Sequence, residues 1–233
     1  MLPTRTTGRT SWPTSSRRAS PITRRYLLWD HDGVLVDTER WYFEATREAL
    51  GRLGVELRQD TYLDQMAQGR SCWDLARSRG VPEERIAQHR AHRDSAYQDF
   101  LLTKPIEIEG VRQVLAELRV AHRMAIVTSA RRVDFDLIHE SSGLLESFDF
   151  ALTIEDYARP KPHPDAYLAA LDRFGAPQRE ALALEDSARG LEAARRAGLD
   201  CLVIRSPFTA SQDFGAAWRV VESIREVPAL LAA

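Results

Sequence analysis

The sequence predicts an α/β protein, in which a doubly wound parallel sheet forms the core and an all-helical domain is inserted after the first strand. Two observations support this fold class. From residue 124 onward, short apolar runs alternate with helical patterns, and this order gives a parallel sheet with helices on both faces. Between residues 38 and 109 the sequence shows no convincing strand pattern, only helical stretches separated by glycines and a proline.

The strands of the core are expected at short apolar runs. The first is Tyr26–Trp29, which Gly33 ends. The later strands are expected at 124–128, 148–153, 181–185 and 201–204. The helices between them are expected at 131–140, 164–174 and 187–197. Residues 206–219 indicate a loop before a last short strand and a C-terminal helix.

The inserted block has its own helices, which are expected near 39–53, 59–67, 72–79 and 83–102. A helical block between the first strand and the rest of a parallel sheet indicates a cap domain. We therefore expect a core formed by residues 26–38 and 109–233 and a cap formed by residues 39–108. Within the cap, Trp41 and Trp73 are expected to pack its interior rather than to contact a substrate.

Residues 1–25 differ in composition from the rest of the chain. They contain six arginines, ten serines or threonines, three prolines and no acidic residue. We expect a disordered Arg/Ser-rich tail, with an organellar transit peptide or a nucleic-acid-binding arm as the alternatives. The tail lacks the apolar segment of a secretory signal. The remaining chain is acidic, which argues against a nucleic-acid partner.

Composition also limits the environment of the protein. No apolar run approaches the roughly 18–20 residues that would span a membrane, so no membrane partner is expected. Cys72 and Cys201 lack the spacing of a metal or redox motif, which favours buried thiols in a reducing compartment. We expect a cytoplasmic protein that is a monomer or a small homo-oligomer.

Two carboxylates one residue apart follow the first strand. Asp30 and Asp32 leave the predicted sheet at the carboxyl end of this strand, where open α/β sheets place their ligands. Two anions so close together favour a cation, and hard oxygen donors favour Mg²⁺. One carboxylate can then attack an electrophile while the other moves a proton. Strand alternation is expected to turn His31, which lies between them, away from both.

Two further stretches place polar residues after later strands. Thr128 and Ser129 precede a helix, where hydroxyls and free backbone N–H groups can hold an anion. Glu185 and Asp186 again put acids at the end of an apolar run. Because parallel strands end at one edge of the sheet, these residues are expected to converge on Asp30 and Asp32.

Lysine usage singles out one residue. Of 32 basic residues only Lys104 and Lys161 are lysines, and an isolated lysine in an arginine-rich chain indicates a need for a compact ammonium group. Lys161 lies between Pro160 and Pro162, which restrict the loop around it. Lys104 has no carboxylate cluster beside it in the sequence and is expected on the surface of the cap.

Together these stretches resemble the haloacid dehalogenase superfamily, in the subgroup with a helical cap inserted after the first motif. The segments DHDGVLVDTE, RPKPHPD and LEDSARG are most similar to the β-phosphoglucomutase and small sugar-phosphatase branch. The resemblance covers residues 26 to about 230. It implies a Rossmann-like core, a magnesium ion and a phosphorylated substrate.

The resemblance also implies a role for each matching residue. Asp30 is implied as the nucleophile that forms an aspartyl-phosphate, and Asp32 as the general acid and base. Thr128, Ser129 and Lys161 are implied as phosphate-binding residues. The implied magnesium ligands are Asp30, the backbone carbonyl of Asp32, and Asp186, with Glu185 supporting them. An acid two residues after the nucleophile is typical of the phosphatases and mutases of the family.

The cap residues favour a phosphatase over a mutase. The mutase branch has a histidine in the first cap helix, and Tyr42 occupies that position here. It also has an arginine after a Gly-x-Ser pattern, whereas here the arginine of Gly69-Arg70-Ser71 is out of register. Tyr42 and Arg70 are nevertheless candidate substrate contacts. We therefore expect a Mg²⁺-dependent phosphatase for a small phosphate ester such as a sugar phosphate. A phosphosugar mutase and a non-catalytic binding module are the alternatives.

Overall fold

The computed structural model describes residues 24–140 and 142–232, so residues 1–23 of the predicted tail lie outside the described chain. The strands are β1 (Tyr26–Trp29), β2 (Arg123–Val127), β3 (Phe150–Leu152), β4 (Ala181–Glu185), β5 (Asp200–Ile204) and β6 (Arg219–Val221). The cap helices are α1 (Glu39–Gly51), α2 (Gln59–Ala67), α3 (Asp74–Ser78) and α4 (Glu83–Thr103). The core helices are α5 (Val111–Leu118), α6 (Arg132–His139), α7 (Asp165–Phe174), α8 (Ala188–Arg196) and α9 (Val227–Leu231). Of these, α5 was not among the helices expected from the sequence.

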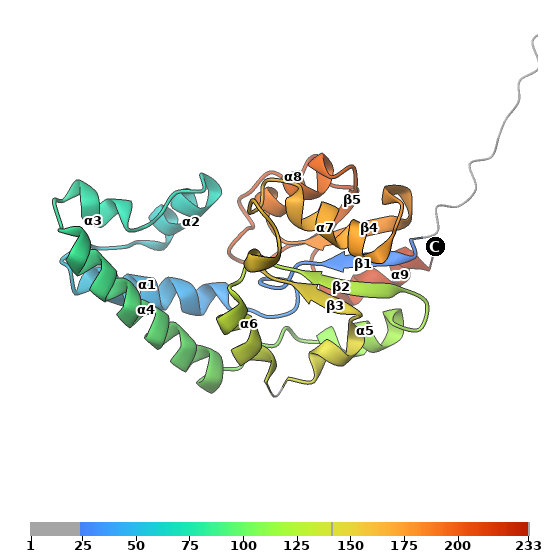
Figure 1. Cartoon of the computed structure of the whole chain (residues 1–233), viewed down its shortest axis with the longest axis horizontal. Helices are drawn as coiled ribbons and strands as arrows, with labels where there is room; N and C mark the ends of the chain where they lie inside the picture. Colours follow the sequence, from blue (N-terminus) through green and yellow to red (C-terminus); the bar gives the residue numbers. More distant parts are fainter. Residues whose placement is uncertain (1–23, 141, 233) are drawn as a thin grey trace, which may run out of the picture.

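The described chain forms a parallel sheet of six strands in the order β3-β2-β1-β4-β5-β6. This confirms the predicted doubly wound α/β fold. Figure 1 shows β1 in the middle of the sheet, with the cap helices beyond the carboxyl end of β1. The strand order runs outward from β1 in both directions, and the loops on either side of such a switch point diverge to leave a crevice.

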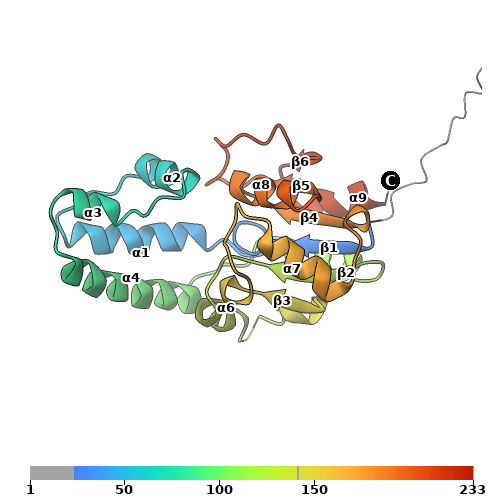
Figure 2. The same cartoon turned by 45° about the horizontal axis from the view of Figure 1, so that its top comes forward.

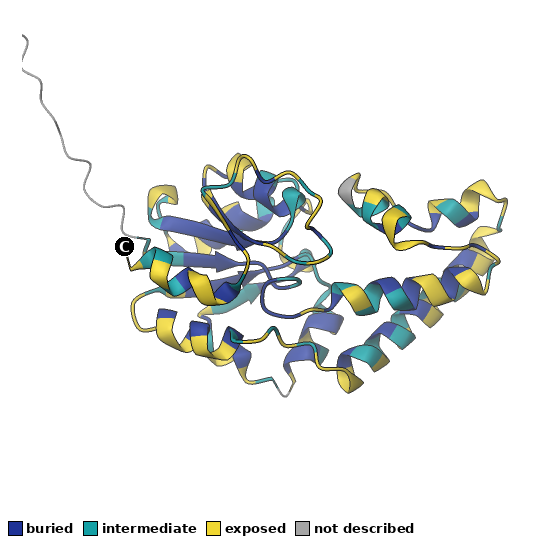
Figure 3. Ribbon diagram, turned by 180° about the vertical axis from the view of Figure 1, so that it is seen from behind, coloured by how far each residue is buried: buried dark blue, intermediate teal, exposed yellow. Residues whose placement is uncertain are grey.

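Side chains alternate along each strand, so apolar side chains point to both faces of the sheet. Helices therefore cover both faces. Leu27 and Trp29 of β1 face α5, α6 and α9, whereas Leu28 faces α7 and α8. All three side chains are fully buried. The central strands β1, β2, β4 and β5 are accordingly among the most deeply buried segments of the described chain, as Figure 3 shows.

The cap, which we define as α1–α4, has a hydrophobic core of its own. Phe43, Leu50, Tyr62 and Ile86 form this core together with Trp73. Figures 1 and 2 show α1 and α4 running side by side, with α3 near the end of this pair that is far from the core and α2 nearer to the core. Trp41 is half-buried against Phe100, with ring centroids 5.4 Å apart.

Both cysteines are buried free thiols, as expected from their spacing. In the described part of the chain, no helix combines the length and the apolar character needed to cross a bilayer.

Two glycines allow polar groups to approach the end of the sheet closely. Gly33 follows β1 with φ +80°, and a Cβ atom there would collide with the Asp186 carboxylate. Gly190 lies in α8, and a Cβ atom there would collide with the Glu185 carboxylate. The carboxylates at the end of β4 therefore occupy space that only glycine leaves open.

We predict that Gly190→Ala destabilises the protein by about 2–3 kcal/mol, because overpacking displaces a buried carboxylate. Gly51→Ala is the matched control, since a Cβ atom on this helical glycine meets nothing within 4 Å. The control is expected to be neutral or more stable by up to about 1 kcal/mol. Urea unfolding of both variants measures the difference, and equal stabilities would contradict the proposed collision.

Candidate active site

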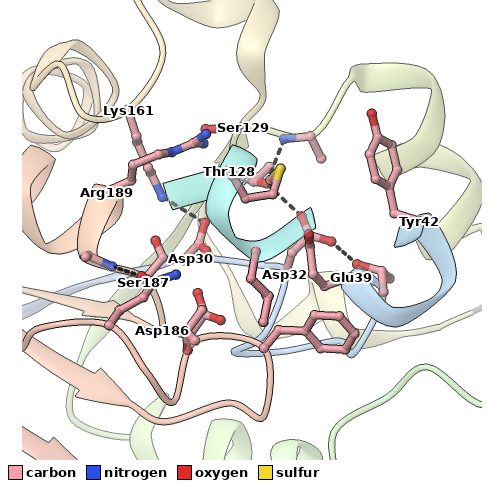
Figure 4. A pocket seen from close by; sticks show the side chains of 18 of the residues that line it. Asp30, Asp32, Glu39, Tyr42, Thr128, Ser129, Lys161, Asp186, Ser187 and Arg189 are labelled. Carbon is pink, nitrogen blue, oxygen red and sulfur yellow. Dashed lines mark hydrogen bonds and ion pairs between the residues drawn. The ribbon is translucent and has the colours of Figure 1, made fainter. Parts of the chain in front are cut away.

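The polypeptide after β1 is held firmly beside β4. The backbone N–H of Asp30 donates to the carbonyl of Leu184 at 2.8 Å, which extends the sheet pairing by one residue. The chain then turns, and the N–H of Gly33 donates to Val36 O at 2.7 Å. This turn places the carboxylates of Asp30 and Asp32 at the same end of the sheet, as Figure 4 shows.

Lys161 forms the centre of a buried ion cluster. Its ammonium group donates to Asp30 Oδ1 at 2.8 Å, to Glu185 Oε1 at 2.6 Å and to the carbonyl of Val127 at 2.9 Å. Burial lowers the pKa of Lys161, but Asp30 and Glu185 outweigh burial and raise it above its usual value. The ammonium is therefore charged, and three acceptors fix its position.

Glu185 supports this cluster from the end of β4. Its side chain is fully buried, and Tyr167 donates a hydrogen bond to Oε1 at 2.6 Å. Ser187 donates to Oε2 at 3.2 Å, and the Ser187 hydroxyl also accepts from Gly190 N–H at the start of α8. Because both carboxylate oxygens already have donors, Glu185 is well suited to orient Lys161.

A group of three carboxylates could hold a metal ion. Asp30, Glu185 and Asp186 each offer an oxygen, and these oxygens lie within 4.8 Å of one another. Burial, together with the charges of Asp30 and Glu185, raises the pKa of Asp186 well above its usual value. Burial also raises the pKa of Asp30 to about 7, and Glu185 adds to this rise while Lys161 opposes it. A cluster in which anions outnumber the single ammonium, with oxygen donors alone, fits Mg²⁺.

The Asp32 carboxylate faces a different set of donors. Thr38 donates to Oδ1, and Thr128 lies 3.5 Å from Oδ2. His31 Nδ1 lies 3.4 Å from the same Oδ2, so the expectation that His31 points away from both aspartates is wrong for Asp32. Burial raises the pKa of Asp32, but His31, Thr38 and Lys161 together hold it below its usual value. In this arrangement Asp32 accepts hydrogen bonds, and it must take up a proton before it can act as an acid.

Thr128 and Ser129 lie directly after β2 and face the same space. The Thr128 hydroxyl accepts from the backbone N–H of Ala130 at 3.0 Å, and Tyr157 donates to the Thr128 carbonyl at 2.8 Å. Both residues line a cleft that Asp30, Asp32 and Lys161 also line. The structure therefore brings the predicted phosphate-binding residues together with the paired carboxylates.

This cleft has a volume of about 520 Å³ and lies between the cap and the core. Several residues that the sequence analysis did not single out line it. From the cap they are Glu39, Leu63, Met66, Arg93 and Tyr97, and from the core they are Arg131, Arg189 and Phe208. The cleft thus combines charged, aromatic and apolar groups opposite the carboxylate pair.

The two cap residues that were predicted to contact substrate differ in position. Tyr42 lines the cleft, with the Arg93 guanidinium 4.4 Å from the centre of its ring. Arg70 is exposed and is absent from the described lining of the cleft. It follows the turn at Gly69 that ends α2, so its side chain meets solvent instead of the carboxylates.

Glu39 is the acidic group that the cap adds to the cleft. The Tyr62 hydroxyl donates to its carboxylate, and burial raises the pKa of Glu39 to about 7. Glu39 directly follows the first motif in sequence, at the start of α1. Its place next to this motif could have identified it from the sequence as a residue of the site. Arg93 had no such signal, since only the packing of α4 against α1 brings it to the cleft.

Comparison with known proteins agrees with this geometry. Residues 27–204 match the family model described as haloacid dehalogenase-like hydrolase. The chain is 30% identical to the protein CbbY of Cereibacter sphaeroides over 88% of this chain and 94% of that protein. It is 27% identical to the fructose-1-phosphate phosphatase YqaB of Escherichia coli over 77% of this chain and 95% of that protein.

A solved structure agrees with these sequence relatives. A mutant of CbbY from Rhodobacter sphaeroides in complex with xylulose-(1,5)bisphosphate superposes with a TM-score of 0.74 and 26% identity, covering 88% of this chain and 96% of that one. The family model spans most of the chain and includes all four motifs that carry the resemblance. The chain therefore belongs to the haloacid dehalogenase-like hydrolases.

Proposed function

We propose that this protein is a Mg²⁺-dependent phosphatase that hydrolyses a small phosphorylated metabolite through an aspartyl-phosphate. One observation carries the proposal. Lys161 holds one carboxylate oxygen of Asp30 at 2.8 Å while Asp32, two residues later, lines the same cleft under separate donors. This arrangement separates the two roles that cleavage of a phosphate ester requires, namely attack on phosphorus and proton transfer to the leaving oxygen.

The reaction follows from the positions of these groups. The free oxygen of Asp30 attacks phosphorus and the bond to the ester oxygen breaks. Asp32, which has taken up a proton before this step, gives it to this oxygen, which leaves as an alcohol and leaves Asp32 ionised. A water molecule then attacks the same phosphorus, Asp32 accepts its proton, and the bond to Asp30 breaks to release phosphate. Thr128, Ser129 and Lys161 bind phosphoryl oxygens during both steps, in which positioning and charge stabilisation dominate.

The carboxylates at the strand ends would hold the metal ion. Asp30, Asp186 and the backbone carbonyl of Asp32 are the proposed ligands, with Glu185 orienting the cluster through Lys161. When bound, Mg²⁺ would reduce the repulsion between the phosphoryl group and the buried carboxylates. Ser206, which donates to Asp186 at 2.9 Å, holds this ligand from the loop after β5.

The cleft favours hydrolysis of a polar, hydroxylated ester. Glu39 and Arg93 present hydrogen-bonding groups from the cap, and the relatives include a fructose-1-phosphate phosphatase and a protein solved with a sugar bisphosphate. Tyr42 occupies the position at which the mutase branch has a histidine, and burial raises the pKa of its phenol. A phenol that keeps its proton does not replace an imidazole in proton transfer. We therefore propose a sugar phosphate as the substrate and water as the acceptor.

We predict that Asp30→Asn lowers kcat for p-nitrophenyl phosphate on the order of 10⁴-fold or more, because the amide is not a nucleophile. Asp37→Asn is the matched control, since Asp37 is an exposed aspartate in the same loop, and its kcat is expected to stay within about twofold of the wild type. EDTA is expected to abolish turnover and added Mg²⁺ to restore it. Turnover that withstands EDTA, or a fully active Asp30→Asn protein, would refute the proposal.

We predict that Glu39 gives substrate binding a pH dependence. Because the pKa of Glu39 is raised to about 7, its carboxyl group is mostly protonated below this pH and mostly ionised above it. An ionised carboxylate accepts hydrogen bonds from sugar hydroxyls more strongly, so KM for fructose 1-phosphate should fall as the pH rises through 7.

The comparison is with p-nitrophenyl phosphate, which is also a phosphate monoester but lacks the sugar hydroxyls. Glu39→Gln should raise KM for fructose 1-phosphate about tenfold at alkaline pH and remove the difference in pH dependence between the two esters. The ratio of the KM values for the two esters is measured against pH in both proteins. If this ratio changes with pH in Glu39→Gln as it does in the wild type, Glu39 does not cause the pH dependence.

A further inference from the structure

Two buried histidines lie next to Asp32 and are not part of the described lining of the cleft. His31 follows the nucleophile in sequence and is fully buried, and His139 at the end of α6 is almost fully buried. Their Nε2 atoms lie 2.9 Å apart. Both rings pack against Phe135, with centroid distances of 5.2 Å for His31 and 4.5 Å for His139. The proposed reaction assigns no role to either imidazole.

The contacts of these rings form a continuous chain of hydrogen bonds. His31 Nδ1 lies 3.4 Å from Asp32 Oδ2, and His139 Nδ1 lies 2.8 Å from the hydroxyl oxygen of Ser142. That hydroxyl oxygen also accepts the backbone N–H of Leu144 at 3.2 Å. The chain therefore runs from the loop after α6 to the carboxylate of Asp32.

The chemistry of its two ends fixes the direction of this chain. An ionised Asp32 only accepts hydrogen bonds, so Nδ1 of His31 must carry the proton. In a neutral imidazole the other nitrogen then accepts, so His139 must donate from Nε2 and accept at Nδ1. The Ser142 hydroxyl supplies that last hydrogen while its oxygen accepts from Leu144. This arrangement satisfies every member, and Nδ1 of His31 donates to Asp32 whether the His31 ring is neutral or protonated.

The surroundings keep the His139 ring neutral, as this arrangement requires. Burial and the neighbouring His31 together lower the pKa of His139 to about 3. Two protonated imidazoles in contact would repel each other in a buried site, and a neutral His139 lets one hydrogen be shared between the two Nε2 atoms.

We propose that His31 is a positioning residue for Asp32, and that His139 and Ser142 hold His31 in the tautomer that donates to it. This inference rests on the proposed role of Asp32 as the general acid. With Thr38 on Oδ1 and His31 on Oδ2, the carboxylate cannot rotate freely. A fixed carboxyl group delivers its proton to the leaving oxygen more often in the correct geometry.

Two esters distinguish this role from a structural one. Phenolate is a poor leaving group and needs the proton of Asp32, whereas p-nitrophenolate leaves with little protonation. The second-order constant kcat/KM reports the first chemical step for both. We predict that His31→Leu lowers kcat/KM for phenyl phosphate by about 10–100-fold and that for p-nitrophenyl phosphate by less than about threefold.

Two conservative variants test the direction of the chain. His31→Asn places an amide N–H where Nδ1 was and should retain most of the phenyl phosphate activity. His139→Leu leaves His31 without its donor and should give a smaller loss than His31→Leu, in the same ester-dependent sense. His122→Leu removes a half-buried histidine that contacts Arg24 instead and is the matched control.

The outcomes separate the inference from the function on which it rests. A wild-type protein that hydrolyses neither ester would refute the proposed phosphatase activity. Equal losses for both esters in folded His31→Leu would show a structural role and refute the positioning role alone. If His31→Leu does not fold, His31→Asn and His139→Leu decide, through the ratio of kcat/KM for phenyl phosphate to kcat/KM for p-nitrophenyl phosphate. A ratio in His139→Leu that matches the wild type would then overturn the proposal.

Discussion

The ammonium of Lys161, held between the carboxylates of Asp30 and Glu185, is the interaction on which the site depends. Buried anions repel one another, and removing one partner from a buried ion pair costs about 3–5 kcal/mol. This ammonium lets two carboxylates from β1 and β4 lie side by side beneath the cleft. It also leaves one oxygen of Asp30 free, which allows the same residue to bind a cation and to act as a nucleophile.

The parallel sheet explains how residues far apart in the chain reach this ammonium. Strands β2, β1 and β4 are neighbours, so their carboxyl ends present Thr128, Asp30 and Glu185 along one edge. The loop before α7 brings Lys161 over this edge, where it also binds the Val127 carbonyl. The cap closes the other side of the cleft with groups from α1 and α4. The core therefore supplies the chemistry, and the cap supplies the surface that meets the rest of the substrate.

The sequence was sufficient to predict site residues whose position is determined by the end of a strand. It was insufficient for residues whose position depends on how helices pack. Strand boundaries and the polar residues after them were predictable because parallel strands end at one edge. Helix α5 was missed although Val111, Val114, Leu115 and Leu118 have helical spacing and are buried. Arg93 reaches the cleft only through the packing of the cap. His31 was misplaced because alternation was extended beyond β1, whereas the chain already turns there, with Leu35 N–H bonded to the His31 carbonyl.

The most direct test of the account is to trap the covalent intermediate on Asp30. Borohydride added during turnover of p-nitrophenyl phosphate would reduce an acyl phosphate to an alcohol, so that a phosphorylated aspartate is recovered as homoserine in the digested protein. The account predicts homoserine at position 30, only when substrate and Mg²⁺ are both present. Homoserine at position 32 instead, or its absence under conditions that trap a known aspartyl-phosphate enzyme, would contradict the assignment of the nucleophile.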